Sequence, residues 1–433
     1  MNLGAFTTYP TLRHSLGAVR WDRLTCGIGL SFALLSWSLS YGSVLPQLRD
    51  DLHLSASTAA MHGSVFGVCL LVLSVFGSRF LAALPNGLAL RLCALFMVGG
   101  GVLFGFGHSI AFTLGGAVLT GTGAALFIIV VPGIVYAHQP QAPTQTMSTL
   151  NAFPMVSSTL LPLSVAGAAA IAISWRVAYL GPVLALGAVI AFTTAKASVP
   201  PSPVENPVRI ADLVRVPHLW RRWSVLVFAT LAEVGTVTWG ASIMHDLGGA
   251  AKGTAASLTV GFFIAMFFGR LALAQVLLRF NGQVVLRMAF IGSIVFFVPF
   301  LVGPSLIVRM LGLTGLGVCL SPAYPLSLTR LFELHNDTAA LGRLSAMASG
   351  IGITFGPMLL GVLSDSVGLG WATAVLPIFA LCGLLTVALP HDRVAVVTGS
   401  TVFVDGGGHI NGAHWVPDLP NEPPSPRRAQ EPT

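Results

Sequence analysis

Apolar residues fill most of the chain in long runs, and short polar segments separate one run from the next. A helix that crosses a membrane needs about 20 predominantly apolar residues. Twelve runs are long enough, and we expect them to form membrane-spanning helices whose ends lie within several residues of 24–46, 56–80, 85–107, 109–136, 148–173, 175–197, 223–246, 254–279, 284–303, 305–329, 343–364 and 370–390.

The longest polar segment inside this pattern covers 198–222 and leaves six runs on either side. Its proline-rich start cannot continue a helix, and residues 210–216 could form a short amphipathic helix on the membrane surface. The predicted organisation is a terminal segment over 1–23, a six-helix half over 24–197, a central loop over 198–222, a second six-helix half over 223–390 and a polar tail over 391–433.

Composition agrees with the pattern, because 54% of the 433 residues are hydrophobic and only 9% are charged. Soluble proteins carry about 25% charged residues, so a water-soluble enzyme is excluded, as is a largely disordered chain. The net charge of +7 comes from scattered basic residues, so we expect a lipid bilayer and no nucleic acid as partner. The five cysteines lie in apolar runs without close pairing, which argues against a disulfide framework or a metal site.

Basic residues also predict the orientation. If the N-terminus is cytoplasmic, the predicted outer loops hold only Arg49, Arg176 and Lys252, and nearly all other basic residues face the cytoplasm. Basic residues prefer cytoplasmic loops. We therefore expect a multi-pass protein of the plasma membrane with both termini in the cytoplasm.

The two halves resemble each other at an offset of 196 residues. Asp50 matches Asp246, Arg91 matches Arg287, and the Trp175 region matches that of Trp371. Each match is short, and together they indicate two parallel six-helix repeats. The fold class predicted is an all-α membrane protein with twelve transmembrane helices.

Over about residues 20–390 this organisation resembles the major facilitator superfamily. The resemblance implies a substrate site near the bilayer midplane, between parallel halves. It also implies gating at the loops after the second and eighth helices, where a glycine and arginine signature is partly kept. The candidate gating residues are Arg79, Arg91, Arg270 and Arg287; the acidic residue of that signature is missing from the first loop.

Three further stretches resemble the fucose-permease-like branch of sugar symporters. These are Glu233 to Gly235 with Trp239, the Gly269-Arg270 pair, and the segment 321–325. The fifth helix does not carry the glycine and proline signature of antiporters. The resemblance therefore favours symport.

Glu233 is the leading functional candidate. It lies roughly 15 Å into the seventh span, at about 1.5 Å per residue, and ionisable groups at such depth are costly and commonly functional. A carboxyl group in hydrocarbon is protonated more easily than one in water, which suits proton coupling. The alternatives are sodium binding, or a glutamate that only hydrogen-bonds neighbouring helices.

Other polar and aromatic residues inside the spans are candidates for the substrate cavity. They are Trp37, Tyr41, Asn151, Thr230, Thr236, Trp239, Arg309 and Tyr324. Aromatic rings and hydroxyls suit a sugar or another polar solute, but they also anchor or join helices. Arg309 could bind an anionic group, pair with Glu233, or extend to the outer headgroups.

These residues favour a transporter over the alternatives. Glycine-rich stretches such as 115–125 lack the lysine and the preceding strand of a phosphate loop, so we expect no cofactor, no catalytic residues and no ATP drive. We predict a monomeric, proton-coupled symporter of a small organic solute that works by alternating access. Efflux of drugs or metabolites is the first alternative, and a non-transporting sensor with the same fold is the second.

The tail after residue 390 is polar, with a strand-like run over 394–404. Residues 397–413 resemble the last strand and exit loop of short-chain dehydrogenases. The stretch is short and lacks that family's cofactor loop and catalytic pair, so we infer no dehydrogenase activity from it.

Overall fold

The structure is a computed structural model that describes residues 19–82, 84–139, 143–150, 152–194, 218–334 and 338–388. Every regular element in this part of the chain is a helix. The helices are α1 (Arg23–Leu39), η1 (Tyr41–Ser43), α2 (Leu45–Leu52), α3 (Ala56–Ala82), α4 (Asn86–Phe106), α5 (Ile110–His138), α6 (Pro143–Leu150), α7 (Ala152–Ala170), α8 (Trp175–Thr194), α10 (Leu219–Asp246), α11 (Lys252–Leu258), α12 (Val260–Leu277), α13 (Gly282–Val302), α14 (Leu306–Leu320), α15 (Ala323–Phe332), α16 (Thr338–Val367), α17 (Leu369–Ala372) and α18 (Val375–Ala388).

Eleven of these helical stretches are long and apolar enough to cross a membrane, and α1 adds a shorter apolar helix. Several spans are built from consecutive helices, such as α11 with α12 and α14 with α15. The twelve predicted spans are therefore confirmed. The seventh begins at Leu219, which is earlier than its predicted start. The predicted surface helix at 210–216 and the tail after 390 lie outside the described residues.

Short polar residues set the starts of several helices. Asp22 precedes α1, and its Oδ1 accepts a hydrogen bond of 2.9 Å from the backbone N–H of Thr25. Asn281 and Ser305 cap α13 and α14 in the same way. Such caps satisfy backbone N–H groups that the first helical turn leaves without partners.

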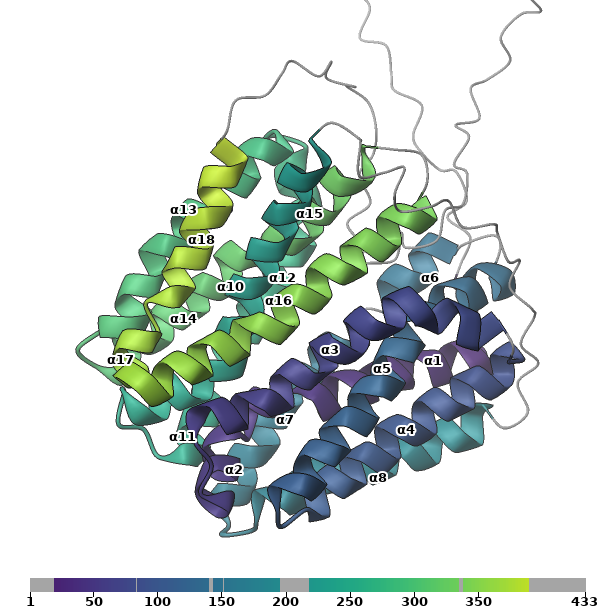
Figure 1. Ribbon diagram of the computed structural model, residues 1–433, viewed down its shortest axis with the longest axis horizontal. Helices are drawn as coiled ribbons and strands as arrows, with labels where there is room; N and C mark the ends of the chain where they lie inside the picture. The colour runs from purple at the N-terminus through teal and green to yellow at the C-terminus, as the bar shows by residue number, and fades with distance from the viewer. Residues whose placement is uncertain are drawn as a thin grey trace, which may run out of the picture.

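Each half has its own apolar core. Residues such as Leu34 and Phe127 belong to the core of the first half, whereas Phe290 and Leu316 belong to that of the second. The halves lie side by side in Figure 1, with α3 and α16 running along each other between them. At Gly67 these two helices approach so closely that a Cβ atom would lie 2.5 Å from the backbone nitrogen of Thr354.

Candidate functional site

Glu233 forms an ion pair with Arg270 inside the second half. Glu233 lies midway along α10, and its Oε1 accepts a hydrogen bond of 3.0 Å from Nη2 of Arg270, which lies midway along α12. Their side chains are 18% and 23% exposed, respectively, so both are partly accessible. The second carboxylate oxygen, Oε2 of Glu233, is buried and has no hydrogen-bond partner within the described residues.

The pair lies at the boundary with the first half. Nη1 of Arg270 is 3.8 Å from the sulfur of Met155 on α7, a helix of the first half. Tyr324 on α15 lies close enough to interact electrostatically with both Glu233 and Arg270. Its hydroxyl is 3.2 Å from that of Ser349 on α16. Residues from five helices of both halves thus form a polar cluster around one partly buried ion pair.

The position of Arg270 differs from its predicted place in a gating loop. Arg270 lies within the eighth span and pairs with Glu233. The sequence alone also allows that pairing for Arg309. Nη1 of Arg309 instead donates to the backbone carbonyls of Phe300 and Leu301, at 3.1 and 2.7 Å. Arg309 therefore caps the end of α13 and is not part of the polar cluster.

Three predicted cavity residues on α10 point into helix packing. The hydroxyls of Thr230 and Thr236 are buried and donate to carbonyls of their own helix. Trp239 is fully buried, and its Nε1 donates to the carbonyl of Pro357 on α16 at 3.1 Å. Trp239 thus links α10 to α16, and the hydrogen bonds of all three side chains lie outside the polar cluster.

The aromatic candidates of the first span are also packing residues. Nε1 of Trp37 donates to the carbonyl of Tyr179 at 3.0 Å, and the indole is buried. The ring of Tyr41 packs 4.9 Å from that of Phe104 and near that of His62. Both belong to the core of the first half. Asn151, another cavity candidate, lies outside the described residues.

Two of the predicted gating arginines hold helix ends within their own half. Nη2 of Arg91 donates to the carbonyl of Thr194 at 3.4 Å, and Nη2 of Arg287 donates to that of Val387 at 3.5 Å. The two arginines thus make equivalent contacts in the two repeats, on α8 and α18. The side chain of Arg79 lies outside the described residues.

A set of polar contacts joins the two halves at one end of the molecule. This end lies opposite the start of α10 at Leu219. Nη1 of Arg49 lies 2.9 Å from Oδ2 of Asp246, and Lys252 pairs with Asp50. In addition, Asp365 on α16 accepts hydrogen bonds of 2.7 and 2.9 Å from the first backbone N–H groups of α3. We call these two ion pairs, together with the two hydrogen bonds of Asp365, the closed-end contacts.

The closed-end contacts were not among the candidates, although the sequence carried a signal for them. Asp50 and Asp246 are matched positions of the internal repeat, and each faces a cation of the other half. Among the described residues, no group of three or more His, Cys, Asp or Glu side chains could hold a metal ion.

Comparisons with known proteins agree with this architecture. The family model of the Major Facilitator Superfamily matches residues 26–329. A bacterial homologue of the human lysosomal transporter Spinster, in its inward-facing and unoccupied conformation, superposes with a TM-score of 0.67 at 14% identity, covering 84% of this chain and 95% of that one. The occupied conformation gives a TM-score of 0.66 at 13% identity, with the same coverage.

The nucleoside transporter NupG is similar to the same degree, with a TM-score of 0.67, 14% identity and coverage of 84% of this chain and 98% of that one. No curated protein matches the sequence. At these identities the solved structures establish the fold alone, and the family model covers well over half of the sequence. The chain is a multi-pass membrane transporter that belongs to the major facilitator superfamily.

Proposed function

We propose that the protein is a proton-coupled symporter of a small organic solute in the plasma membrane, with Glu233 as the proton-carrying group. The observation that carries this proposal is the ion pair between Glu233 and Arg270 at the boundary between the halves. Charged groups at membrane depth are costly, and a buried ion pair gives little net stability compared with apolar packing. A role in transport accounts for the presence of both charges.

Protonation is the step that couples the two charges to transport. When Glu233 takes up a proton it loses its charge, and the ion pair with Arg270 is replaced by a weaker hydrogen bond from the guanidinium to a neutral carboxyl group. The guanidinium of Arg270 then becomes free to donate to an acceptor group of the solute. The sulfur of Met155 lies 3.8 Å from Nη1 of this guanidinium, so a solute with an anionic or strongly polar acceptor beside an apolar part fits best.

Alternating access requires that the halves open at one end while they close at the other. The closed-end contacts support a state that is shut at the end of α2 and α11 (Figure 1). We propose that this end faces outward and that both termini are cytoplasmic, which agrees with the distribution of basic residues. The similarity to inward-facing structures of another transporter supports the same direction.

The test is a flux measurement in proteoliposomes that contain a pH-sensitive dye. A panel of sugars, organic acids and hydrophobic cations is added under an imposed proton gradient. Wild type is compared with Glu233→Gln and with the matched control Glu333→Gln, because Glu333 is 53% exposed at the end of the second half. We expect a solute-dependent pH change that Glu233→Gln loses and Glu333→Gln keeps.

Three outcomes would contradict the proposal in different ways. If Glu233→Gln still accumulated the solute against the solute's own gradient, Glu233 would not be the proton-carrying group. Proton movement opposite to the solute would establish efflux by exchange in place of symport. Binding of a panel compound with no flux in either direction would leave a sensor with the transporter fold.

A further inference from the structure

His245 lies beside one of the ion pairs of the closed-end contacts, at the end of the molecule that we call the closed end. It belongs to the last turn of α10 and directly precedes Asp246. Its Nε2 lies 3.8 Å from Oδ1 of Asp246, and Oδ2 of the same carboxylate lies 2.9 Å from Nη1 of Arg49 on α2. One carboxylate of the second half therefore faces an imidazole of its own half and a guanidinium of the other half.

A hydrogen bond at the other ring nitrogen determines where His245 takes up a proton. Nδ1 lies 2.7 Å from the backbone carbonyl oxygen of Ala250, in the turn between α10 and α11. A carbonyl oxygen only accepts hydrogen bonds, so Nδ1 carries the proton of the neutral ring. The nitrogen that gains a proton in acid is therefore Nε2, which faces Asp246. Because the side chain is 31% exposed, protons from the solvent reach it, and imidazole changes its charge within the physiological pH range.

Other charged groups near this end of α10 come from the helices packed against it. Among the described residues they are Arg49, Asp50 and Asp51 on α2, Lys252 on α11, Arg309 on α14 and Asp365 on α16. Asp50 and Lys252 pair with each other, and the last two and Asp51 are bound by groups other than His245. Coulomb energy falls with distance, so the carboxylate of Asp246 and the guanidinium of Arg49 have the largest effect on a proton at Nε2.

The ion pair with Arg49 makes proton binding at His245 depend on whether the halves are closed. In the closed state Asp246 is paired with Arg49, and the positive charge of Arg49 also repels a protonated imidazole. When the halves separate at this end, Arg49 leaves with α2, whereas Asp246 stays next to His245. A protonated His245 is therefore more favourable in the open state. Because such coupling is reciprocal, protonation of His245 favours opening by the same free energy.

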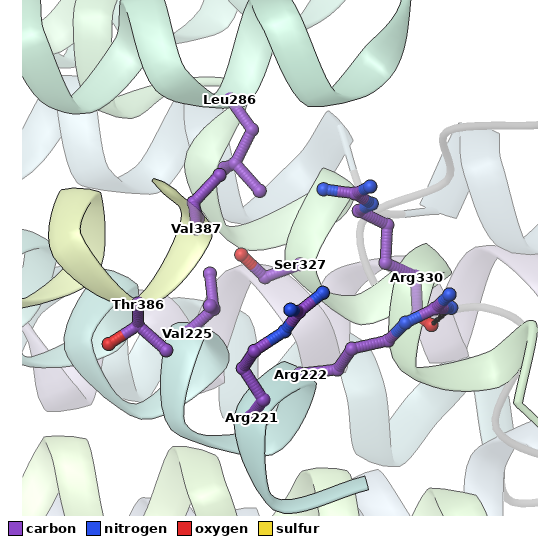
Figure 2. A pocket seen from close by; sticks show the side chains of 8 residues that line it. All are labelled: Arg221, Arg222, Val225, Leu286, Ser327, Arg330, Thr386 and Val387. Atoms are coloured by element: carbon purple, nitrogen blue, oxygen red, sulfur yellow. Dashed lines mark hydrogen bonds between the residues drawn. The ribbon is translucent and has the colours of Figure 1, made fainter. Parts of the chain in front are cut away.

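The opposite end of the second half holds a group of arginines whose identified partners belong to that half. Figure 2 shows Arg221, Arg222 and Arg330 there, around a small hollow. Arg222 donates to the carbonyl of Arg330 and to Oε2 of Glu333, and Arg330 donates to Oε1 of Gln283. Separation of the halves leaves these contacts intact. The ion pairs identified between the halves lie at the closed end, where His245 is.

We propose that His245 is a proton sensor of the closed end, whose protonation weakens the contact between Asp246 and Arg49 and favours the state that is open there. The proposal concerns the opening of this end, and it does not require Glu233 to carry the transported proton. If this end faces outward, as proposed above, acid outside the cell opens the protein toward the compartment from which a symporter takes up protons.

The test measures the distance between spin labels on cysteines introduced at His53 and Ser366, which are exposed on the two halves. The purified full-length protein, without its native cysteines, is studied in neutral detergent between about pH 5 and pH 8, the range in which imidazole changes its charge. We expect the open-to-closed ratio to rise by up to about fivefold from the upper to the lower pH, the limit set by one exposed ion pair. His245→Gln should remove this rise, because glutamine can still donate to the carbonyl of Ala250 but does not change its charge.

His108→Gln is the matched control, because it removes another exposed histidine at the same end. His108 lies between α4 and α5, and Arg176 joins this turn to α2 by binding both the carbonyl of Gly107 and the carboxylate of Asp51. His108→Gln should keep the rise in the open-to-closed ratio. Glu233→Gln should keep it too, which separates the sensor from the proposed coupling site.

Asp246→Asn is the second variant, and it decides the question if His245→Gln does not fold. It removes the carboxylate that links His245 to Arg49, so most of the rise should disappear. The proposal is overturned if wild type shows no rise, or if acid favours the closed state. It is equally overturned if the full rise persists in His245→Gln or Asp246→Asn, or if His108→Gln or Glu233→Gln abolishes it.

Discussion

Asp50 and Asp246 occupy equivalent positions in the two repeats, and each forms an ion pair with a cation of the opposite half. Asp246 pairs with Arg49 at 2.9 Å, and Asp50 pairs with Lys252. The duplication has therefore placed the same carboxylate on both sides of one interface. Because both pairs must break for the halves to separate at this end, they bias the protein toward the state that is closed there.

The first prediction concerns this bias. Asp50→Asn and Asp246→Asn should each favour opening of the closed end. An exposed ion pair contributes about 0–1 kcal/mol, so each change should shift the open-to-closed ratio by up to about fivefold. The shift is measured by spin-label distances between cysteines introduced at His53 and Ser366, which are exposed on the two halves, in a variant that lacks the native cysteines.

Asp51→Asn is the control for this prediction. Asp51 follows Asp50 directly, but its carboxylate accepts from Trp175 at 2.9 Å and lies near Arg176, both in its own half. The distance distribution should stay as in wild type. An equal shift in Asp51→Asn would mean that general loss of negative charge, and not the contacts between the halves, sets the equilibrium.

The second prediction concerns the stability of the central ion pair. Arg270→Gln leaves the carboxylate of Glu233 partly buried without its cation, which is more costly than the loss of both charges. Arg270→Gln should therefore lower the melting temperature by several degrees, and the double variant Glu233→Gln/Arg270→Gln should recover most of the loss. If the double variant is as unstable as the sum of the single variants, the two side chains are not coupled.

The architecture was predictable because the bilayer imposes strict rules on sequence. Each span must be apolar over about 20 residues, so the composition alone marks twelve spans and their grouping. Glu233 was identifiable for the same reason, since a carboxylate within an apolar run is conspicuous. Its partner was not, because sequence does not say which faces of α10 and α12 meet.

Several cavity candidates form hydrogen bonds within the helix packing, and they do so for a common physical reason. A polar side chain inside a membrane needs a hydrogen-bond partner wherever it points. Trp37 and Trp239 satisfy this need with the carbonyls of Tyr179 and Pro357, and Arg309 satisfies it with the end of α13. A residue that serves packing and one that serves a cavity therefore look alike in the sequence.

The third prediction is a pH dependence at the start of α1. Burial raises the pKa of Asp22, but the hydrogen bond from Thr25 and the pairing with His138 at 2.7 Å outweigh it, so the pKa lies below the ordinary value of 3.8. A lowered pKa means that the charged form stabilises the fold at pH values above 3.8, and that this contribution disappears as the pH falls through the lower, folded-state value.

Asp22→Asn isolates the charge, because asparagine remains a good helix cap. The variant should melt at a slightly lower temperature than wild type at neutral pH, by an amount that reflects about 0.5–1 kcal/mol. The difference should stay constant down to about pH 5 and shrink below the ordinary value of 3.8. If the difference in melting temperature between the variant and wild type grew as the pH fell, the charged form of Asp22 would not be the form that stabilises the fold.

The fourth prediction concerns the crossing of α3 and α16 at Gly67. An added Cβ would lie 2.5 Å from the nitrogen of Thr354 and 2.7 Å from the oxygen of Gly350, both backbone atoms that cannot move aside alone. Gly67→Ala should therefore force the two helices apart, lower the melting temperature by several degrees and reduce flux.

Gly181→Ala is the control, because no atom lies within 4 Å of an added Cβ on Gly181 in α8. Since Ala also favours helix over Gly by about 1 kcal/mol, this control should be neutral or slightly stabilising. Equal behaviour of the two variants would show that the approach at Gly67 is not needed for the contact between the halves.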